Sequence, residues 1–215
     1  MTILYLLFFA ITIVTLVLFH FGIKKQKGPL LYLVIWTIIM SVLANYGLFE
    51  NTNSLPPRVA FIIIPVIVML VYLYRNIKVI DLNYLTALHS IRLPVEIGLF
   101  YYYILRKIPV SMTFEGWNFD IIMGITSIIL ITYMGLGKKQ IAPKFLFYWN
   151  ILGLILLAII VSTAILSAPT PFQQLAFEQP NIAIKGLPFL LLPIVIVPVV
   201  VLSHLLALRE LKNRL

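Results

Sequence analysis

The sequence has no cysteine and few charged residues, and both shortages limit what the protein can be. Without cysteine the chain has no disulfide, no thiolate metal ligand and no cysteine nucleophile. Only 11% of the residues are charged and 62% are hydrophobic, whereas soluble domains carry about a quarter charged residues. The motifs GxGxxG, GxxxxGKS/T and GxSxG are missing as well. The sequence therefore points away from a soluble domain with thiol, nucleotide or serine-hydrolase chemistry.

Long apolar runs fill most of the chain, so a lipid bilayer is its expected solvent. A spanning helix needs about 20 apolar residues, and the mean hydropathy of the whole chain is +1.07. We predict an all-α membrane protein, a single polytopic domain over residues 1–215 that forms a bundle of seven transmembrane helices. The predicted spans lie near 2–23, 29–49, 59–77, 82–105, 118–137, 144–167 and 187–208.

The basic residues predict how these spans are oriented. Eleven of the 16 lysine and arginine residues lie in the connections on one side and in the C-terminal segment, and four lie on the other side. Positive residues favour the cytoplasmic side, so we expect the N-terminus outside and the C-terminus in the cytoplasm, most simply of a bacterial inner membrane. The net charge of +9 is then a topology signal, and we expect no nucleic-acid partner.

Two similar segments suggest an internal duplication. KKQKGP at 24–29 and KKQIAP at 138–143 share four residues, and each would join an inward-running helix to its successor. This predicts parallel repeats of three helices on each side of a linking fourth span, as in some small transporters. The alternative is that inner connections generally contain lysine and that a proline suits the first turn of a helix.

The fourth predicted span carries an unusual polar stripe. At about 100° per residue, four of its side chains fall within an arc of about 60°. They are His89, Arg92, Glu96 and Tyr103. A central arginine costs at least about 2.5 to 3.5 kcal/mol in a bilayer, so this face should point into the bundle or into a wet cavity.

The stripe supports a functional and a structural interpretation. In the first it is a binding site or a proton or ion pathway, where Arg92 holds an anion, Glu96 exchanges a proton or binds a cation and His89 relays protons. In the second, Arg92 and Glu96 form a buried ion pair four residues apart that fixes helix packing. Pro94 would add a kink and free the carbonyl of Ser90.

The three histidines allow another chemistry. His20, His89 and His204 all fall toward the predicted cytoplasmic side, where two of them could ligate a metal ion or haem. Alternatively they are separate interfacial histidines, since the chain has no HxxxH or HExxH motif. We predict no cofactor, and metal or haem stays an alternative.

Two acidic residues lie at the outer mouth of the fifth predicted span. Glu115 and Asp120 could attract cations or form an outer gate, although a carboxylate in the first turn also suits the helix dipole. At the other end of the chain, Pro193 and Pro198 predict a kink in the last span. Trp149 is expected near a membrane interface, where aromatic rings prefer to lie.

Three classes of function remain open. The leading expectation is a transporter-like or solute-binding membrane protein whose partners are the bilayer and a small solute or ion. The second is an intramembrane enzyme or redox protein that uses the histidines. The third is an accessory or assembly subunit whose stripe faces outward and docks onto a membrane-protein partner or onto a second copy of the chain.

Overall fold

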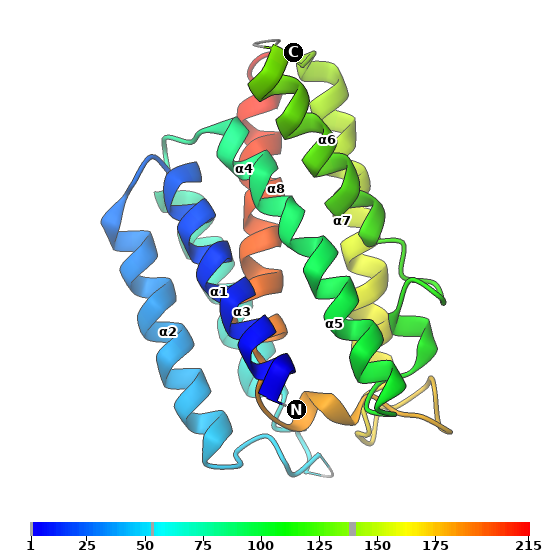
Figure 1. The fold of residues 1–215 in the computed structure, drawn as a ribbon. Helices are drawn as coiled ribbons and strands as arrows, with labels where there is room; N and C mark the ends of the chain where they lie inside the picture. Colours follow the sequence, from blue (N-terminus) through cyan, green and yellow to red (C-terminus); the bar gives the residue numbers. More distant parts are fainter. Residues whose placement is uncertain (1, 53, 138–140) are drawn as a thin grey trace.

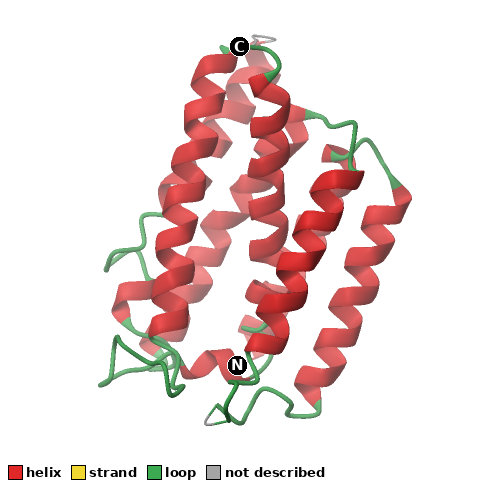
Figure 2. Ribbon diagram, turned by 180° about the vertical axis from the view of Figure 1, so that it is seen from behind, coloured by secondary structure: helices red, strands yellow, loops and turns green. Residues whose placement is uncertain are grey.

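The chain forms a helical bundle with its two ends on opposite sides. The computed structural model describes residues 2–52, 54–137 and 141–215, and these residues contain no β-strand. The prediction of an all-α protein is thus confirmed for this part of the chain, whose helices run side by side (Figures 1 and 2). The α-helices are α1 (Thr2–Gly22), α2 (Lys27–Asn45), α3 (Ala60–Asn76), α4 (Leu82–Leu88), α5 (Arg92–Ile104), α6 (Ile121–Gly137), α7 (Pro143–Leu166) and α8 (Val197–Lys212).

Within the described part of the chain, four helical stretches are long and apolar enough to cross a membrane. They are α1, α2, α7 and the stretch Leu192–Lys212. Helices α3 and α6 are apolar but shorter. Large apolar side chains point away from the bundle, as at Leu31, Ile35 and Ile38 of α2. Such surfaces suit hydrocarbon rather than water, which is compatible with an integral membrane protein.

The fourth predicted span lies inside the bundle and is broken in the middle. A 3₁₀ turn, η1 (His89–Ile91), separates α4 from α5. Pro94 follows this turn and has no N–H for the carbonyl of Ser90, which explains why the α-helical pattern is interrupted here. The α4–η1–α5 stretch packs against α1, α6 and α8, so His89, Arg92 and Glu96 of the predicted stripe lie in the interior, whereas Tyr103 is partly exposed.

The last span begins with a π-helical turn. This turn, η4 (Leu192–Ile196), contains Pro193 and leads directly into α8. Pro198 lacks the N–H that would bond the carbonyl of Ile194, and the Nε1–H of Trp36 on α2 donates to that oxygen at 2.9 Å instead. A side chain from another helix therefore satisfies the carbonyl that the proline leaves free.

Two glycines let helices approach α5 closely from either side. A Cβ at Gly98 of α5 would lie 2.8 Å from the Phe8 ring of α1, and a Cβ at Gly124 of α6 would lie 2.7 Å from the backbone nitrogen of Leu93. Real Cβ atoms do not approach so near, so both contacts depend on glycine. They hold α1 and α6 against the helix that carries Arg92.

Several sequence boundaries shift in the structure. The fifth predicted span, expected from residue 118, becomes helical only at Ile121 because Asn118 and Asp120 are turned into the bundle. The seventh, expected at 187–208, becomes the stretch Leu192–Lys212. Lys138, Lys139 and Gln140, the first half of the KKQIAP segment, lie outside the described residues, so their part in the predicted repeat and orientation has no structural description.

Candidate functional site

Arg92 is the centre of a buried polar cluster. Its Nε donates to Oδ2 of Asp120 at 2.6 Å, and its Nη2 bonds the other oxygen of the same carboxylate. Nη2 also donates to the carbonyl of Gly153 at 3.2 Å, and Nη1 lies 3.2 Å from Nε2 of His204. The guanidinium thus links α5 to the start of α6, to α7 and to α8. A two-point contact of this kind is the strongest geometry for an arginine and a carboxylate.

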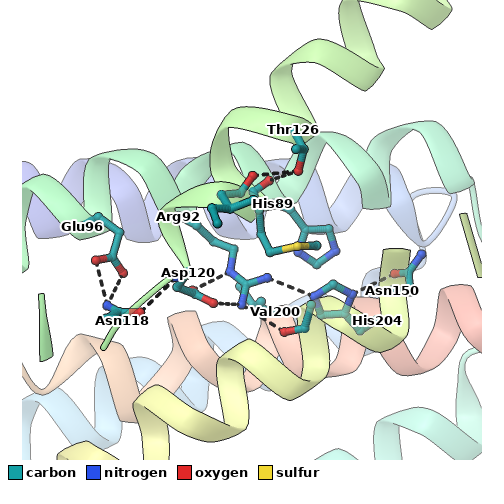
Figure 3. A network of polar contacts seen from close by, with 12 residues as sticks. His89, Arg92, Glu96, Asn118, Asp120, Thr126, Asn150, Val200 and His204 are labelled. Atoms are coloured by element: carbon teal, nitrogen blue, oxygen red, sulfur yellow. Dashed lines mark hydrogen bonds and ion pairs between the residues drawn. The ribbon is translucent and has the colours of Figure 1, made fainter. Parts of the chain in front are cut away.

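Glu96 does not pair with Arg92, contrary to the contact that the spacing of four residues predicts. Both of its carboxyl oxygens face Nδ2 of Asn118, at 2.6 and 2.7 Å. Oδ1 of Asn118 accepts the backbone N–H of Asp120 at 3.1 Å. A single amide therefore lies between the two carboxyl groups, as Figure 3 shows, and Asp120 rather than Glu96 neutralises the arginine.

The contacts of His204 define its protonation and tautomer. Arginine has only N–H donors, so Nε2 of His204 must accept from Arg92. Nδ1 then carries the proton and donates to Oδ1 of Asn150 at 2.8 Å, while Nδ2 of Asn150 donates to the carbonyl of Leu146. His204 is neutral in this arrangement. It connects Arg92 to Asn150 and so completes a continuous series of contacts from Glu96 to Asn150 (Figure 3).

His89 stacks on His204 and leaves one nitrogen without a partner. The ring centroids are 3.8 Å apart with 21° between the planes. The hydroxyl of Ser203 donates to the carbonyl of Val200, so it accepts from Nε2 of His89 at 3.2 Å. Nδ1 of His89 is buried and has no hydrogen-bond partner among the described residues.

The cluster is closed on every side. Arg92 is 2% exposed, Glu96 and His89 are 1% exposed and His204 is 0% exposed. A Cβ at Gly153 would lie 2.4 Å from Cε1 of His204, so only glycine permits this approach of α7 to α8. The described residues of the bundle therefore cover these side chains almost completely.

The formal charges of the cluster depend on one group. Arg92 and Asp120 cancel, and the hydrogen bonds described above keep His204 neutral. With His89 neutral, the cluster is neutral when Glu96 carries a proton or binds a monovalent cation, and negative when it does neither. Glu96 receives hydrogen bonds only from a neutral amide and belongs to none of the ion pairs among the described residues.

The structure brings some of the predicted residues together and separates others. His89, Arg92, Glu96, Asp120 and His204 meet in this cluster. The Tyr103 ring lies away from it and packs beside Phe100. The two residues predicted at the outer mouth have different surroundings: Glu115 is exposed, whereas Asp120 is buried. His20 is half-buried on α1, and its ring contacts Phe21.

The histidine pair does not have the geometry of a metal or haem site. Two axial haem ligands direct one nitrogen each at a metal between them, but these rings stack face to face and each Nε2 faces a protein group. Among the described residues no three histidine or acidic side chains are grouped so as to hold a metal ion.

Sequence reasoning missed the neutral members of the cluster. They are Asn118, Asn150, Gly153 and Ser203, which carry no charge and scarcely alter the hydropathy of a span. Trp149 was expected at an interface, yet it is 6% exposed and its ring centroid lies 5.3 Å from that of His89. Its Nε1–H donates to Thr126 at 3.0 Å, so this ring belongs to the interior.

In the described residues, the fold and the site together define a helical protein with four helices long and apolar enough to cross a membrane and a polar cluster buried among α5, the start of α6, α7 and α8. Residues 54–212 match a family described as a domain of unknown function, DUF8737, and the chain belongs to this family. The match covers α3 to α8 and every residue of the cluster. No curated protein and no solved structure matches the chain.

Proposed function

We propose that this protein is a transporter-like integral membrane protein in which Glu96 reversibly binds a proton or another cation. In this proposal the α4–η1–α5 stretch is the fourth of seven spans, the N-terminus lies outside and the membrane is a bacterial inner membrane. The observation that carries the proposal is the position of Glu96, a buried carboxyl group whose only hydrogen-bond donor among the described residues is the amide of Asn118. Ionisable groups inside a membrane usually serve ion or proton movement.

The cluster favours a cation over an anion as the ligand. An anion would have to displace Asp120 from Arg92, whose remaining contacts are to the Gly153 carbonyl and to His204. Breaking a buried pair of this kind costs about 3–5 kcal/mol. A cation or proton at Glu96 displaces no ion pair and makes the whole cluster neutral, so it is the smaller perturbation.

The broken helices provide the means for such a site to open. The 3₁₀ turn η1 lies next to Arg92, and the π-helical turn η4 begins the span that carries His204. Interrupted helices at a buried site are typical of transporters with internal repeats. In the proposed duplication, spans one to three and five to seven are the two repeats, and the fourth span links them. Helix α1 begins the first repeat and helix α6 begins the second. Both pack against the linking α4–η1–α5 stretch.

Infrared difference spectroscopy of the protein in liposomes tests the proposal. Changing the pH or the cation of the medium should produce a carboxyl band that disappears in Glu96→Gln. Glu115→Gln removes an exposed glutamate and should leave this band unchanged. If Glu96→Gln gives the same difference spectrum as the native protein under every pH and cation tested, Glu96 binds no cation and the proposal is wrong.

A docking role for the stripe has less support. That alternative requires polar side chains on the outer surface, whereas His89, Arg92 and Glu96 are almost completely buried within their own bundle. The surface that a partner would meet is formed by apolar side chains, as on α2.

A further inference from the structure

The contacts of Asn118 determine which way round its amide lies. Nδ2 donates to both oxygens of Glu96 and to the carbonyl of Met112 at 3.1 Å, and Oδ1 accepts the N–H of Asp120. Exchanging the nitrogen and the oxygen would place the NH₂ group against that N–H and the oxygen against three other oxygens. With Glu96 ionised every contact would then be repulsive, and the contacts with the Met112 carbonyl and the Asp120 N–H would be repulsive in either protonation state of Glu96, which fixes the orientation.

The Met112 carbonyl and the Asp120 carboxylate, which lie in this part of the cluster, are directed at N–H groups. The Met112 carbonyl faces the amide of Asn118, and both oxygens of Asp120 face Arg92. Of the charged groups close to Glu96, Arg92 lies on its own helix and Asp120 precedes α6. On the α1 side, Phe8 and Leu7 line this part of α5 at Gly98. A hard cation such as Ca²⁺ requires about six to eight oxygen ligands, which this surrounding does not offer.

We propose that the ligand of Glu96 is a proton and not a metal ion, because Asn118 presents a hydrogen-bond donor where a metal ion would need an oxygen. This inference rests on the proposed function and narrows it. A proton needs only a lone pair of the carboxylate, and its arrival adds an O–H donor to one oxygen, which still has acceptor capacity. Nδ2 of Asn118 cannot accept from this O–H, so the O–H of a protonated Glu96 points away from Nδ2 while Nδ2 goes on donating to Glu96.

Asn118 is thus a positioning residue that excludes metal ions. Asn118→Asp replaces the NH₂ group by an oxygen and places a second carboxyl group beside Glu96. The changed site can share one cation between two carboxyl groups. Asn181→Asp is the matched control, because Asn181 is buried like Asn118, at 0% and 2% exposed, but lies outside the cluster, with its Nδ2 on the carbonyl of Ala164.

The test follows the Glu96 carboxyl band by infrared spectroscopy in liposomes. The pH midpoint of the band is measured in choline chloride, which supplies no metal ion, and again in NaCl, KCl and CaCl₂. In the native protein we expect the same midpoint in all four salts, and likewise in Asn181→Asp. For Asn118→Asp we expect a lower midpoint in NaCl or CaCl₂ than in choline, because a bound metal ion competes with the proton.

Three results would overturn the inference, and they differ in their meaning for the proposed function. A native midpoint that falls in one of the metal salts shows that Glu96 binds that metal, which leaves a cation site but not a proton-selective one. The same is shown by a band that appears only with metal. If no Glu96-dependent band responds to pH or to metal, the inference and the proposed function both fail.

Discussion

Two ion pairs in this protein join the same kinds of charge in very different surroundings. Lys24 and Asp81 link the end of α1 to the start of α4, with Nζ 2.7 Å from Oδ2 and side chains 50% and 23% exposed. Arg92 and Asp120 link α5 to α6 with side chains 2% and 6% exposed. The first pair keeps access to water, whereas further hydrogen bonds to protein groups surround the second.

The difference teaches which charges the fold depends on. An exposed pair contributes about 0–1 kcal/mol because water and salt screen it. A buried pair contributes little compared with apolar residues of the same size, yet removing one partner is very costly because the other charge stays buried alone. We therefore expect large effects at the buried pair and small ones at the exposed pair.

Removal of Asp120 should have the largest effect. Asp120→Ala leaves the guanidinium of Arg92 without its carboxylate and should lower the free energy of unfolding by about 3–5 kcal/mol. The double variant Arg92→Met with Asp120→Ala should recover most of this loss. Denaturant titration in detergent micelles, followed by circular dichroism, measures both. Equal losses in the single and double variants would show that the charge of Arg92 is not the cause.

The glycine beside the buried pair should give the next largest effect. Gly153→Ala pushes a methyl group against His204 and should cost about 1–3 kcal/mol. Gly135→Ala is the control, since a Cβ there meets nothing within 4 Å and alanine favours a helix by up to about 1 kcal/mol. The thermal midpoints of the two variants should shift in opposite directions. If Gly153→Ala is as stable as the native protein, the packing of α7 on α8 tolerates a side chain.

Substitution in the exposed pair should have a small effect on stability, and this effect should depend on pH. Partial burial alone would raise the pKa of Asp81, but hydrogen bonds from Lys24 and from the N–H of Asn83 outweigh it and hold the pKa below its usual value. A lowered pKa stabilises the fold above the unfolded value of about 3.9, and this contribution is lost as the pH falls through the folded value. Asp81→Asn should therefore cost less than about 1 kcal/mol at neutral pH.

Thermal unfolding over a pH series measures this change. The difference between Asp81→Asn and the native protein should be greatest near neutral pH and should shrink on acidification. A difference that grows as the pH falls would mean that Asp81 is not stabilised as the carboxylate.

The smallest expected effect is the dependence of the two ion pairs on salt concentration. Raising the ionic strength from about 0.1 to 1 M shortens the screening length from about 10 to 3 Å. The cost of Asp81→Asn should fall under this change, while the cost of Asp120→Ala should stay the same because the buried pair is shielded from ions. Denaturant titration at the two salt concentrations makes the comparison. A parallel loss at both sites would show that water reaches Arg92.

The sequence allowed the charged part of the cluster to be predicted, because a charge in an apolar run is conspicuous. His89, Arg92 and Glu96 were identified on one face of one helix. The structural interpretation paired Arg92 with Glu96, its neighbour along the helix, whereas the structure pairs it with Asp120, which approaches only through the packing of α6 on α5. No local pattern carries that tertiary contact.

The neutral part of the cluster could not be predicted for a different reason. Asn118 and Asn150 are ordinary polar residues in or beside apolar runs, and their importance comes from partners distant in the chain. Gly153 has no side chain, so its role appears only in the distance to His204. Helix positions depend on long apolar runs and were easier to predict, while the breaks at η1 and η4 followed from Pro94, Pro193 and Pro198.

The place of Trp149 gives the protein a built-in optical reporter. The chain has three tryptophans, of which Trp117 is exposed and Trp36 donates to the backbone of the last span. Only Trp149 touches the histidine pair, with ring centroids 5.3 and 6.0 Å away. After Trp36→Phe and Trp117→Phe, the remaining fluorescence comes from this one indole. Its emission then follows rearrangement of the cluster in real time, without any attached dye.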